Sequence, residues 1–321
     1  MPIGVGIIGC GIMARRTQAL MAAHGGFAVR RAFDPDPAAV AEAGLEPAAD
    51  ADALVAAADV DLVYIACPPT RHAEHARRAL AAGKPVLCEK PLGVDVAESR
   101  RLVEAFEAAG LQNAVNFSYA GSPARTWLTE RLAAGDAGTV EGIDIRIHYT
   151  QWPEDWQAPA AWVAGRAEGG FVREVLSHFV FFLTDVMGPT TVKWSRLRHA
   201  DGADGTLAET HAWADLDCGG IPISFAGGTG GSGPDVGQVT VWGSQASYRF
   251  ENWHTPWQSL AGADWTRALT DIEDFRTEAR HRQIIATADW FEGRPHPLPD
   301  FRKALHVQAV IETILGPGAT P

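Results

Sequence analysis

Short apolar segments alternate with alanine-rich stretches along the first 119 residues of the chain. The apolar segments have the length of β-strands, and several alanine-rich stretches end at a glycine, as helices often do. Repeated strand–helix–strand units predict a doubly wound parallel sheet with helices on both faces. The predicted strands cover residues 3–9, 27–34, 61–69, 84–89 and 112–119, and the predicted helices cover 12–24, 37–44, 71–83 and 95–110.

The pattern changes near residue 120. All eleven tryptophans lie from Trp127 onward, and apolar positions now alternate with polar ones. This alternation predicts a large open, mainly antiparallel sheet with one packed and one exposed face. We therefore expect an α/β domain over residues 1–120 and an α+β domain over residues 121–321. The strands predicted in the second domain are 139–150, 190–199, 206–217 and 238–243, followed by helices over 272–292 and 300–315.

The glycine-rich stretch 227–235 (GGTGGSGPD) has the composition of a phosphate-binding loop. It precedes a predicted strand, so no helix N-terminus follows it to receive an anion. We interpret it as a mobile hairpin loop.

Composition and charge narrow the class of protein. A chain of 321 residues suits two domains. It has no apolar run of about 18 residues and no secretory signal pattern, so we expect neither a membrane span nor export. The net charge of −12 argues against a nucleic-acid partner. Four scattered cysteines suit reduced thiols in a cytoplasmic protein.

The segment GCGIMA (residues 9–14) directly follows the first predicted strand and opens the first predicted helix. Gly9 permits the tight turn, Gly11 lets the main chain approach a pyrophosphate, and Ala14 is small enough for helix–strand packing. The helix N-terminus, at Ile12 and Met13, would face the phosphates. The motif predicts a Rossmann fold with a bound nicotinamide dinucleotide, and a β–α turn without a ligand is the alternative.

Asp34 ends the second predicted strand, 25 residues after Gly9. A carboxylate at about this spacing accepts hydrogen bonds from the adenosine ribose and repels a 2′-phosphate. Asp34 therefore favours NAD over NADP, although Arg30 and Arg31 in the same strand weaken the preference.

Cys67, Pro68 and Pro69 lie at the end of the third predicted strand, and His72 follows it. The two prolines end the strand and remove its main-chain donors, so this segment is expected to line the dinucleotide cleft. His72 and His75 share one helical face, but no cysteine pair supports a zinc site, so we expect no metal.

Lysine is scarce, with four lysines against 23 arginines. Arginine keeps its proton at neutral pH, whereas a partly buried lysine can release one. Lys90, held before Pro91 at a predicted strand end, is therefore a candidate catalytic group. An ammonium aimed at a reacting oxygen stabilises a developing alkoxide and can relay its proton. A surface lysine in a turn is the alternative.

The segments GCGIMA (9–14) and VYIACPPTRHAEHARRALAAGKPVLCEKPL (63–92) resemble the Gfo/Idh/MocA family of NAD(P)-dependent oxidoreductases, which includes glucose–fructose oxidoreductase and inositol dehydrogenases. Glu89-Lys90-Pro91 matches the E-K-P signature of that family. The resemblance implies that Glu89 lies in the cofactor site and that Lys90 contacts the nicotinamide ribose and the substrate. The peptide bond at the position of Lys90–Pro91 is often cis in this family. The resemblance also implies an open sheet that joins subunits into a homodimer or homotetramer.

The segment EGGFVREVLSHFVFFL (168–183) begins at two glycines and continues as an apolar predicted helix. Glu174 and His178 are four residues apart and would share one helical face. The family pattern here is Gly-Gly and then Asp-x-x-x-His, so the resemblance implies that His178 is the catalytic acid or base. Glu174 stands where Asp is usual, and would orient His178 or bind a substrate hydroxyl. A core histidine is the alternative for His178.

Asn116 and Tyr119 end the fifth predicted strand and are expected in the substrate cleft. The family often has an arginine near this place, where this chain has Ala120. Trp152, Trp162 and Arg166 precede the predicted helix that carries His178, and family members often contact cofactor or substrate there. An aromatic ring can stack on the C–H face of a sugar, but each tryptophan could equally pack the domain or a subunit interface.

Together these features predict an NAD-dependent dehydrogenase or reductase that acts on a secondary alcohol or ketone of a sugar or cyclitol. The central expectation is that the Lys90 amine and the His178 imidazole converge beside the nicotinamide ring. A redox-neutral glycosidase or epimerase of the same fold, which recycles its NAD, is one alternative. An NAD-binding sensor without enzymatic activity is the other.

Overall fold

The computed structural model describes residues 1–200 and 205–316, which form two compact units. The first unit contains Met1–Phe117, Trp156–Trp162 and His281–Gln308. The second contains Ser118–Asp155, Val163–Arg280 and the residues from Ala309 onward. The first unit therefore takes in two later segments of the chain besides its amino-terminal part.

The first unit is built on a parallel sheet of five strands in the order β2-β1-β3-β4-β5. Every residue of β1, β3 and β4 is buried, which suits a sheet covered on both faces. The predicted doubly wound parallel sheet is confirmed. Its strands are β1 (Ile3–Ile8), β2 (Phe27–Phe33), β3 (Leu62–Ile65), β4 (Val86–Glu89) and β5 (Asn113–Asn116).

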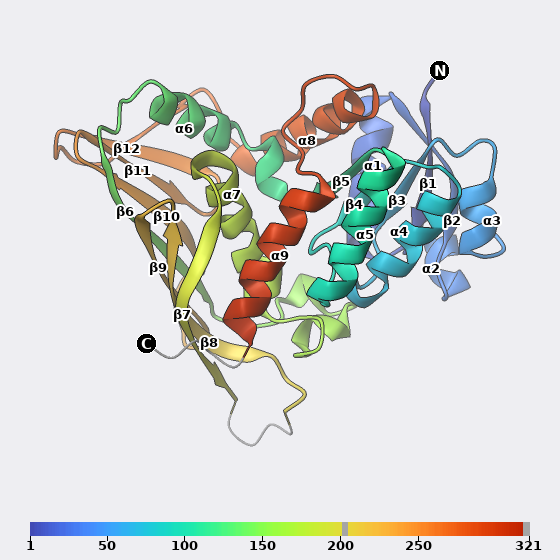
Figure 1. The fold of residues 1–321 in the computed structure, drawn as a ribbon, viewed down its shortest axis with the longest axis horizontal. Helices are drawn as coiled ribbons and strands as arrows, with labels where there is room; N and C mark the ends of the chain where they lie inside the picture. The colour runs from blue at the N-terminus through green and yellow to red at the C-terminus, as the bar shows by residue number, and fades with distance from the viewer. Residues whose placement is uncertain (201–204, 317–321) are drawn as a thin grey trace. The chain divides into compact units, whose positions relative to one another are not determined.

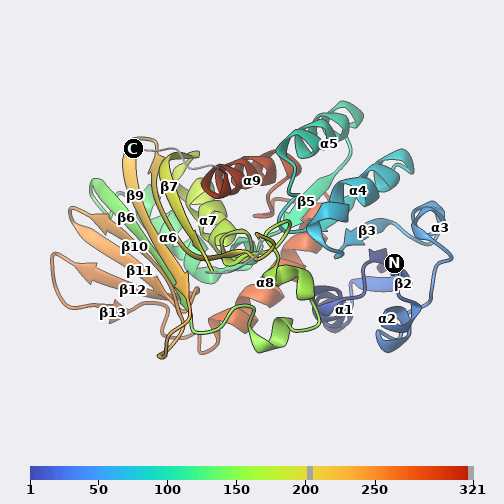
Figure 2. The same ribbon diagram turned by 90° about the horizontal axis from the view of Figure 1, so that it is seen from below.

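Helices cover both faces of this sheet: α4 and α5 lie on one side and α1 on the other (Figures 1 and 2). The side chains of Asp36, Asp50 and Asp95 accept hydrogen bonds from main-chain N–H groups at the starts of three helices. Gly25 and Gly110 end α1 and α5 in the left-handed conformation that favours glycine. The helices are α1 (Ile12–His24), α2 (Pro37–Glu42), α3 (Ala51–Ala56), α4 (His72–Ala81) and α5 (Val96–Ala109), with a 3-10 turn at Pro69–Arg71. Two further helices, α8 (Phe275–Phe291) and α9 (Phe301–Leu315), each run from one unit into the other along the chain.

The second unit is built on an eight-stranded sheet in the order β13-β12-β11-β10-β6-β9-β8-β7. Only β6 and β9 pair in parallel, so the predicted mainly antiparallel sheet is confirmed. One face packs against α7, where all residues from Ser177 to Leu183 are buried (Figure 2). The strands are β6 (Val140–Tyr149), β7 (Thr190–His199), β8 (Glu209–Cys218), β9 (Ile221–Thr229), β10 (Val236–Gly243), β11 (Ala246–Glu251), β12 (Thr255–Leu260) and β13 (Thr266–Arg267). The helices of this unit include α6 (Pro123–Ala133) and α7 (Ser177–Met187), and 3-10 turns lie at Ser118–Gly121, Asp155–Gln157 and Ala161–Ala164.

The predicted hairpin loop over 227–235 is wrong. Gly227 and Gly228 lie inside β9, and β6 separates β9 from β10 in the sheet. The connection instead wraps around the end of β6, where Thr150 donates its main-chain N–H to Asp235 and Gly230 donates to the Tyr149 carbonyl. A local glycine pattern marks a loop but cannot tell which strands it joins.

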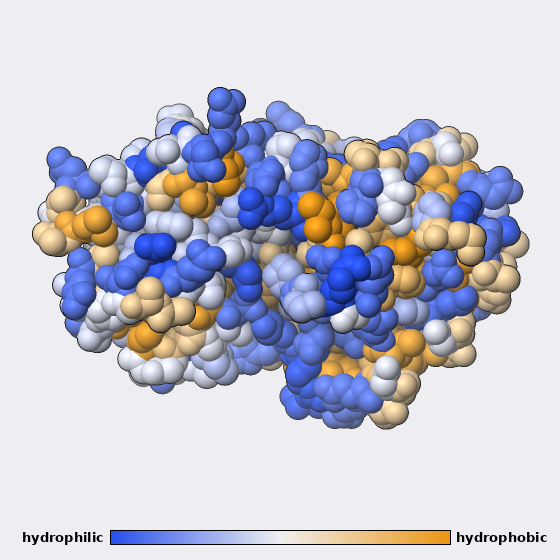
Figure 3. Space-filling view, turned by 90° about the horizontal axis from the view of Figure 1, so that it is seen from above, coloured by the Kyte–Doolittle hydropathy of each residue, from blue (hydrophilic) through white to orange (hydrophobic). Residues whose placement is uncertain are grey.

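Hydrophilic residues cover most of the face seen in Figure 3, and hydrophobic residues appear there in small separate patches. Among the described residues, no helix is long and apolar enough to cross a membrane. All four cysteines are free thiols, and Cys10, Cys88 and Cys218 are buried.

His254 is a buried histidine of the second unit. The imidazole is 5% exposed, its Nδ1 lies 3.2 Å from the Ser122 hydroxyl, and its ring centroid is 5.0 Å from that of Tyr119. Burial, aided by Arg276 and Arg280, lowers the pKa of His254 from 6.5 to about 3. Between these values the unfolded chain binds a proton that the folded chain does not, so stability falls as the pH falls.

We therefore expect urea unfolding at pH 5 and pH 7 to distinguish the wild type from His254→Gln. The wild type should lose about 2 kcal/mol more unfolding free energy than the variant over this interval, because glutamine does not titrate. His75, whose pKa burial lowers to about 4, titrates in both proteins and cancels from the comparison. An equal loss in both proteins would show that His254 binds its proton as readily in the folded chain as in the unfolded chain.

Candidate active site

The glycine loop joins β1 to α1 at the carboxyl edge of the five-stranded sheet. Gly9 has φ +92°, and a Cβ there would lie 2.5 Å from the main-chain nitrogen of Cys67. Only glycine fits this close approach to the end of β3. Gly11 differs, because a Cβ there would meet nothing within 4 Å. The main chain at Gly11 therefore has open space beside it, as the approach of a pyrophosphate requires.

Asp34 lies beside this loop, directly after β2. Its Oδ2 accepts the main-chain N–H of Cys10 at 2.8 Å, and its Oδ1 accepts that of Asp36 at 2.9 Å. The carboxylate is thus fixed at the glycine loop, where the adenosine ribose binds in Rossmann folds. Nearby, burial and Asp34 raise the pKa of the Cys10 thiol to about 11, so this thiol stays protonated at neutral pH.

The segment after β3 is fixed by His72. This imidazole is 1% exposed, with Nδ1 2.8 Å from the Pro91 carbonyl oxygen and Nε2 2.8 Å from that of Cys67. Burial lowers the pKa of His72, which favours the neutral ring, and a neutral ring donates to one of these carbonyls and only contacts the other. The ring therefore links the end of β3 to the turn after β4. Burial also raises the pKa of the Cys67 thiol to about 12.

Glu89 ends β4 as a buried carboxylate, 5% exposed. Its Oε1 accepts hydrogen bonds from the Tyr64 hydroxyl and the Asn116 amide, both at 2.6 Å. Gln283 of α8 donates in turn to the Asn116 side-chain oxygen at 2.5 Å and to the Phe117 carbonyl at 3.0 Å. Burial raises the pKa of Glu89, while the two hydrogen bonds oppose the rise. These bonds join β3, β4, β5 and α8.

Lys90 follows Glu89 immediately and is only half-buried. The Lys90–Pro91 peptide is cis, the isomer that the resemblance implies. Glu89 on one side and the His72-bound carbonyl of Pro91 on the other fix the main chain around Lys90. The structure thus places Lys90 at the same sheet edge as the glycine loop and Asp34, because the carboxyl ends of parallel strands share one edge.

In the second unit, the segment that carries His178 begins at Gly169 and Gly170. Gly170 has φ +98°, and a Cβ there would lie 2.7 Å from the Glu209 carboxylate. This space lets buried Glu209 accept the main-chain N–H of Val172 at 2.8 Å. Burial raises the pKa of Glu209, and the Val172 hydrogen bond opposes the rise.

The predicted uninterrupted α-helix is corrected at this point. Val172–Leu176 form a π-helical turn, in which the Ser177 N–H bonds the Val172 carbonyl five residues earlier, and α7 starts at Ser177. Such wide turns are frequent at functional sites. Half-buried Glu174 lies within the turn and His178 lies in α7, so the α-helical geometry assumed for this pair does not hold.

His178 is 7% exposed, and its Nδ1 lies 3.1 Å from the Ser118 hydroxyl. The Trp253 indole and the imidazole pack edge to face, with ring centroids 5.3 Å apart and an interplanar angle of 66°. Sequence reasoning missed both neighbours. Ser118 had no motif to mark it, and Trp253 comes from a turn 75 residues further along the chain.

The other predicted substrate-binding residues include Tyr119, Trp152, Trp162 and Arg166. Tyr119 is fully buried and donates its hydroxyl to the Trp253 carbonyl at 2.6 Å. Half-buried Trp152 packs against Tyr149 and Phe171. Arg166 is exposed, whereas half-buried Trp162 ends the short segment that belongs to the first unit.

One unpredicted contact lies near the glycine loop in the first unit. The Arg16 guanidinium stacks over the Trp156 indole, 4.4 Å from the ring centroid. The contact joins α1 to the short segment Trp156–Trp162 of the same unit.

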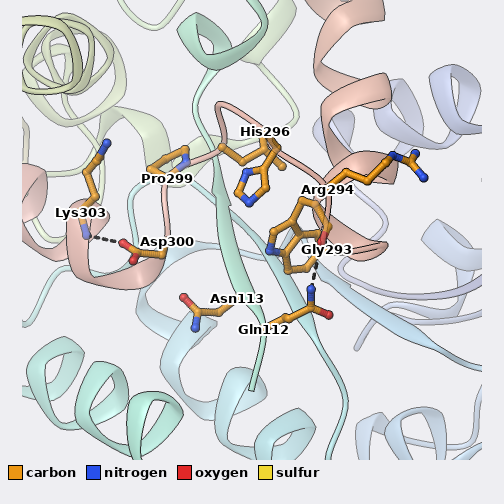
Figure 4. A pocket seen from close by; sticks show the side chains of 10 residues that line it. Gln112, Asn113, Gly293, Arg294, His296, Pro299, Asp300 and Lys303 are labelled. Carbon is orange, nitrogen blue, oxygen red and sulfur yellow. Dashed lines mark hydrogen bonds between the residues drawn. The ribbon is translucent and has the colours of Figure 1, made fainter. Parts of the chain in front are cut away.

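A separate cavity of about 410 Å³ lies at the amino-terminal end of β5, the opposite edge from the glycine loop (Figure 4). Gln112 closes one side by donating to the Trp290 carbonyl at 2.9 Å, and Asp300 accepts the Lys303 main-chain N–H at 2.8 Å. This cavity is distinct from the predicted dinucleotide site. Across residues 1–200 and 205–316, no three His, Cys, Asp or Glu side chains gather as metal ligands would.

Comparison with known proteins agrees with this geometry. Residues 3–117 match the GFO_IDH_MocA family, described as an oxidoreductase family with an NAD-binding Rossmann fold. The predicted resemblance to the Gfo/Idh/MocA oxidoreductases is therefore confirmed for residues 3–117.

Two curated relatives illustrate the range of the family. The chain is 36% identical over 149 residues to dTDP-3,4-didehydro-2,6-dideoxy-alpha-D-glucose 3-reductase of Actinomadura kijaniata, covering 44% of each chain. It is 36% identical over 155 residues to inositol 2-dehydrogenase 1 of Saccharopolyspora erythraea, covering 46% of this chain and 45% of that protein. The chain thus spans less than half the length of these relatives.

Similarity to solved structures extends over nearly the whole chain. A 3-ketoreductase from Actinomadura kijaniata, solved with NADP and TDP-benzene, superposes with a TM-score of 0.81 at 21% identity. The match covers 98% of this chain and 97% of that one. At this identity the likeness concerns the fold, and it confirms the predicted fold class over both units.

The open space at Gly11 leads to a direct test of dinucleotide binding. We expect Gly11→Ala to fold with an unchanged melting temperature, because its Cβ meets nothing within 4 Å. It should weaken NAD binding by about tenfold or more, since the methyl group would occupy the approach to the pyrophosphate. Titration calorimetry with NAD and thermal melts measure the two effects.

Gly142→Ala in β6 is the matched control, because its Cβ would make only ordinary contacts, 3.7 Å from the Pro222 carbonyl. NAD affinity should not change in this control. Unchanged affinity in Gly11→Ala as well would exclude a pyrophosphate at this loop.

Proposed function

We propose that the protein is an NAD-dependent oxidoreductase that moves a hydride between the cofactor and a secondary alcohol or ketone of a sugar or cyclitol. One observation carries the proposal: Lys90 is fixed at the same sheet edge as the glycine loop and Asp34. The Rossmann family of residues 3–117 supports the cofactor class. The names of the two curated relatives, a deoxysugar-nucleotide reductase and an inositol dehydrogenase, support the substrate class.

In the oxidising direction, the carbinol carbon loses hydride, the hydroxyl loses a proton, and a carbonyl forms. A bound nicotinamide would supply the hydride acceptor. The Lys90 ammonium donates a hydrogen bond to the substrate oxygen and stabilises the negative charge that develops there. His178 accepts the hydroxyl proton. Because Ser118 engages Nδ1, we assign this proton exchange to Nε2.

Several side chains support these two groups. The buried bonds of Glu89 and His72 set the main-chain position of Lys90, which geometry-sensitive proton transfer requires. Glu174 is proposed to orient His178 or to bind a neighbouring substrate hydroxyl. Ala120 supplies no charge where the family often has arginine, and Arg125 is engaged in an ion pair with Asp185. At this place in the site, a neutral hydroxyl group of the substrate therefore suits the chain better than a carboxylate or phosphate group.

We also propose a cytoplasmic homodimer or homotetramer. Four free cysteines suit a reducing compartment. The eight-stranded sheet carries Trp242, which is 43% exposed, and the Arg249 guanidinium stacked 4.4 Å from the Trp265 ring. Aromatic and arginine side chains of this kind are enriched at subunit interfaces.

The catalytic proposal is tested with NAD, NADP and a panel of sugars, cyclitols and ketosugars, following absorbance at 340 nm. Lys90→Met and His178→Ala should each lower kcat by at least about a thousandfold, because each removes a group that acts on the reacting oxygen. Both variants should still bind NAD. Lys193→Met, an equal change at an exposed lysine of β7, should keep wild-type turnover.

Other outcomes separate the alternatives. Product release without net NADH formation would indicate a redox-neutral enzyme. NAD binding without turnover of any compound would indicate a sensor, and full activity in either site variant would refute the assigned roles.

Cofactor choice is tested at Asp34. Asp34→Asn keeps an oxygen that can accept a main-chain N–H, but it removes the charge that repels a 2′-phosphate. We expect the ratio of kcat/KM for NAD to that for NADP to fall by about tenfold or more. If the wild type already prefers NADP, or if the variant keeps the same ratio, Asp34 does not set the preference.

A further inference from the structure

The turn between β11 and β12 holds its tryptophan in an unusual backbone conformation. Asn252 and Trp253 have φ values of +48° and +74°. This left-handed region suits glycine, and it costs other residues about 1–2 kcal/mol each. A bulky aromatic residue persists there only where its surroundings fix it. The backbone conformation that holds Trp253 in this place therefore lowers the stability of the folded chain.

Both main-chain groups of Trp253 are bonded. Its N–H donates to the Gly237 carbonyl at 3.0 Å, and its carbonyl accepts the Tyr119 hydroxyl at 2.6 Å. These partners come from β10 and from the 3-10 turn at Ser118–Gly121. Two separate segments thus fix the main chain of the turn.

The indole is fixed as firmly as the main chain. Its Nε1 donates to the Tyr149 hydroxyl at 3.2 Å, and its ring lies 5.1 Å from Phe179 and 6.2 Å from Tyr119, stacked on the latter. A Cβ at Gly237 would approach the indole to 2.7 Å. The chain therefore has a glycine where the indole crosses β10.

This fixed ring system contacts His178 in an edge-to-face arrangement. The centroids are 5.3 Å apart, and Ser118 bonds Nδ1 on the same imidazole. A packed aromatic wall restricts rotation of the imidazole, because a turned ring would clash with the indole. Ser118 then selects which nitrogen points toward the protein.

We propose that Trp253 is a positioning residue: its indole holds the His178 imidazole in the single orientation that presents Nε2 to the substrate. The inference rests on the proposed function of His178 as proton acceptor. Its physical basis, a tryptophan held by two main-chain and three indole contacts against one imidazole, lies entirely within the second unit.

Nitrogen NMR of the imidazole tests the proposal without any substrate. Full-length protein labelled at histidine ¹⁵N is recorded at about pH 8, above the usual histidine pKa. The His178 signals are assigned by their loss in His178→Asn. Wild type should show two well-separated ¹⁵N shifts from one tautomer, and Trp253→Leu should show shifts averaged toward each other. Trp253→Phe, which keeps an aromatic edge, should restore most of the separation.

Gly237→Ala gives a second route that leaves the tryptophan in place. Its methyl group displaces the indole, so the His178 shifts should change in the same direction as in Trp253→Leu. Trp127→Leu is the matched control, because Trp127 packs on Tyr248 and Phe250 of the same unit. It should leave the His178 shifts unchanged. Unchanged shifts in both Trp253→Leu and Gly237→Ala would overturn the inference, as would an equal change in Trp127→Leu.

Turnover separates this inference from the proposed function. With the substrate found in the panel, Trp253→Leu should lose about 10- to 100-fold in kcat, the scale expected for ångström misplacement of a reacting group. NAD affinity should stay the same, and Trp253→Phe should recover part of the rate. Altered NMR shifts with an unaltered kcat would refute the positioning role in catalysis. Wild-type turnover in His178→Ala would refute the proposed function, while the NMR result would still decide whether Trp253 orients the ring.

Discussion

A buried carboxylate, Glu89, organises the end of the parallel sheet on which the proposed chemistry depends. Removing a charge from water is costly unless hydrogen bonds replace the lost solvation. Tyr64 and Asn116 supply those bonds, and Gln283 fixes Asn116 in turn. The carboxylate therefore holds three neighbouring strands and α8 in one arrangement. The same hydrogen bonds fix the main chain at Lys90, the next residue.

The second unit also has a buried carboxylate that fixes the main chain by hydrogen bonding. Buried Glu209 bonds the N–H of Val172, and Gly170 leaves room for it. The chain then makes a π-helical turn before α7 presents His178. In both units a carboxylate inside the protein fixes the main chain at the start of the segment that carries a proposed catalytic residue. Truncating either carboxylate would leave buried donors unsatisfied and disturb the segment that follows.

The local pattern of apolar and polar residues predicted much of the fold. The glycine loop, the helix over 12–24 and the strand over 190–199 have the predicted bounds, because period and end signals are local properties. The short helices at Ala51–Ala56 and Pro123–Ala133, and the strands β9 and β11–β13, were missed. Their apolar pattern is brief or interrupted by glycine and proline, and neighbouring strands stabilise β9 from both sides. The hydrophobic periodicity of a single segment does not show which strands it will pair with.

The sequence by itself determined the dinucleotide loop, the acidic residue that follows it and the Glu89-Lys90-Pro91 segment, because each is a short run whose residue types carry their own chemical meaning. Only the tertiary structure decided the partners: Asn116 for Glu89, Pro91 for His72, and Ser118 and Trp253 for His178. These contacts join residues from 19 to 75 positions apart in the chain. They depend on strand order, on the turn between β11 and β12 and on the space left by glycine, and none of these is a property of a single segment.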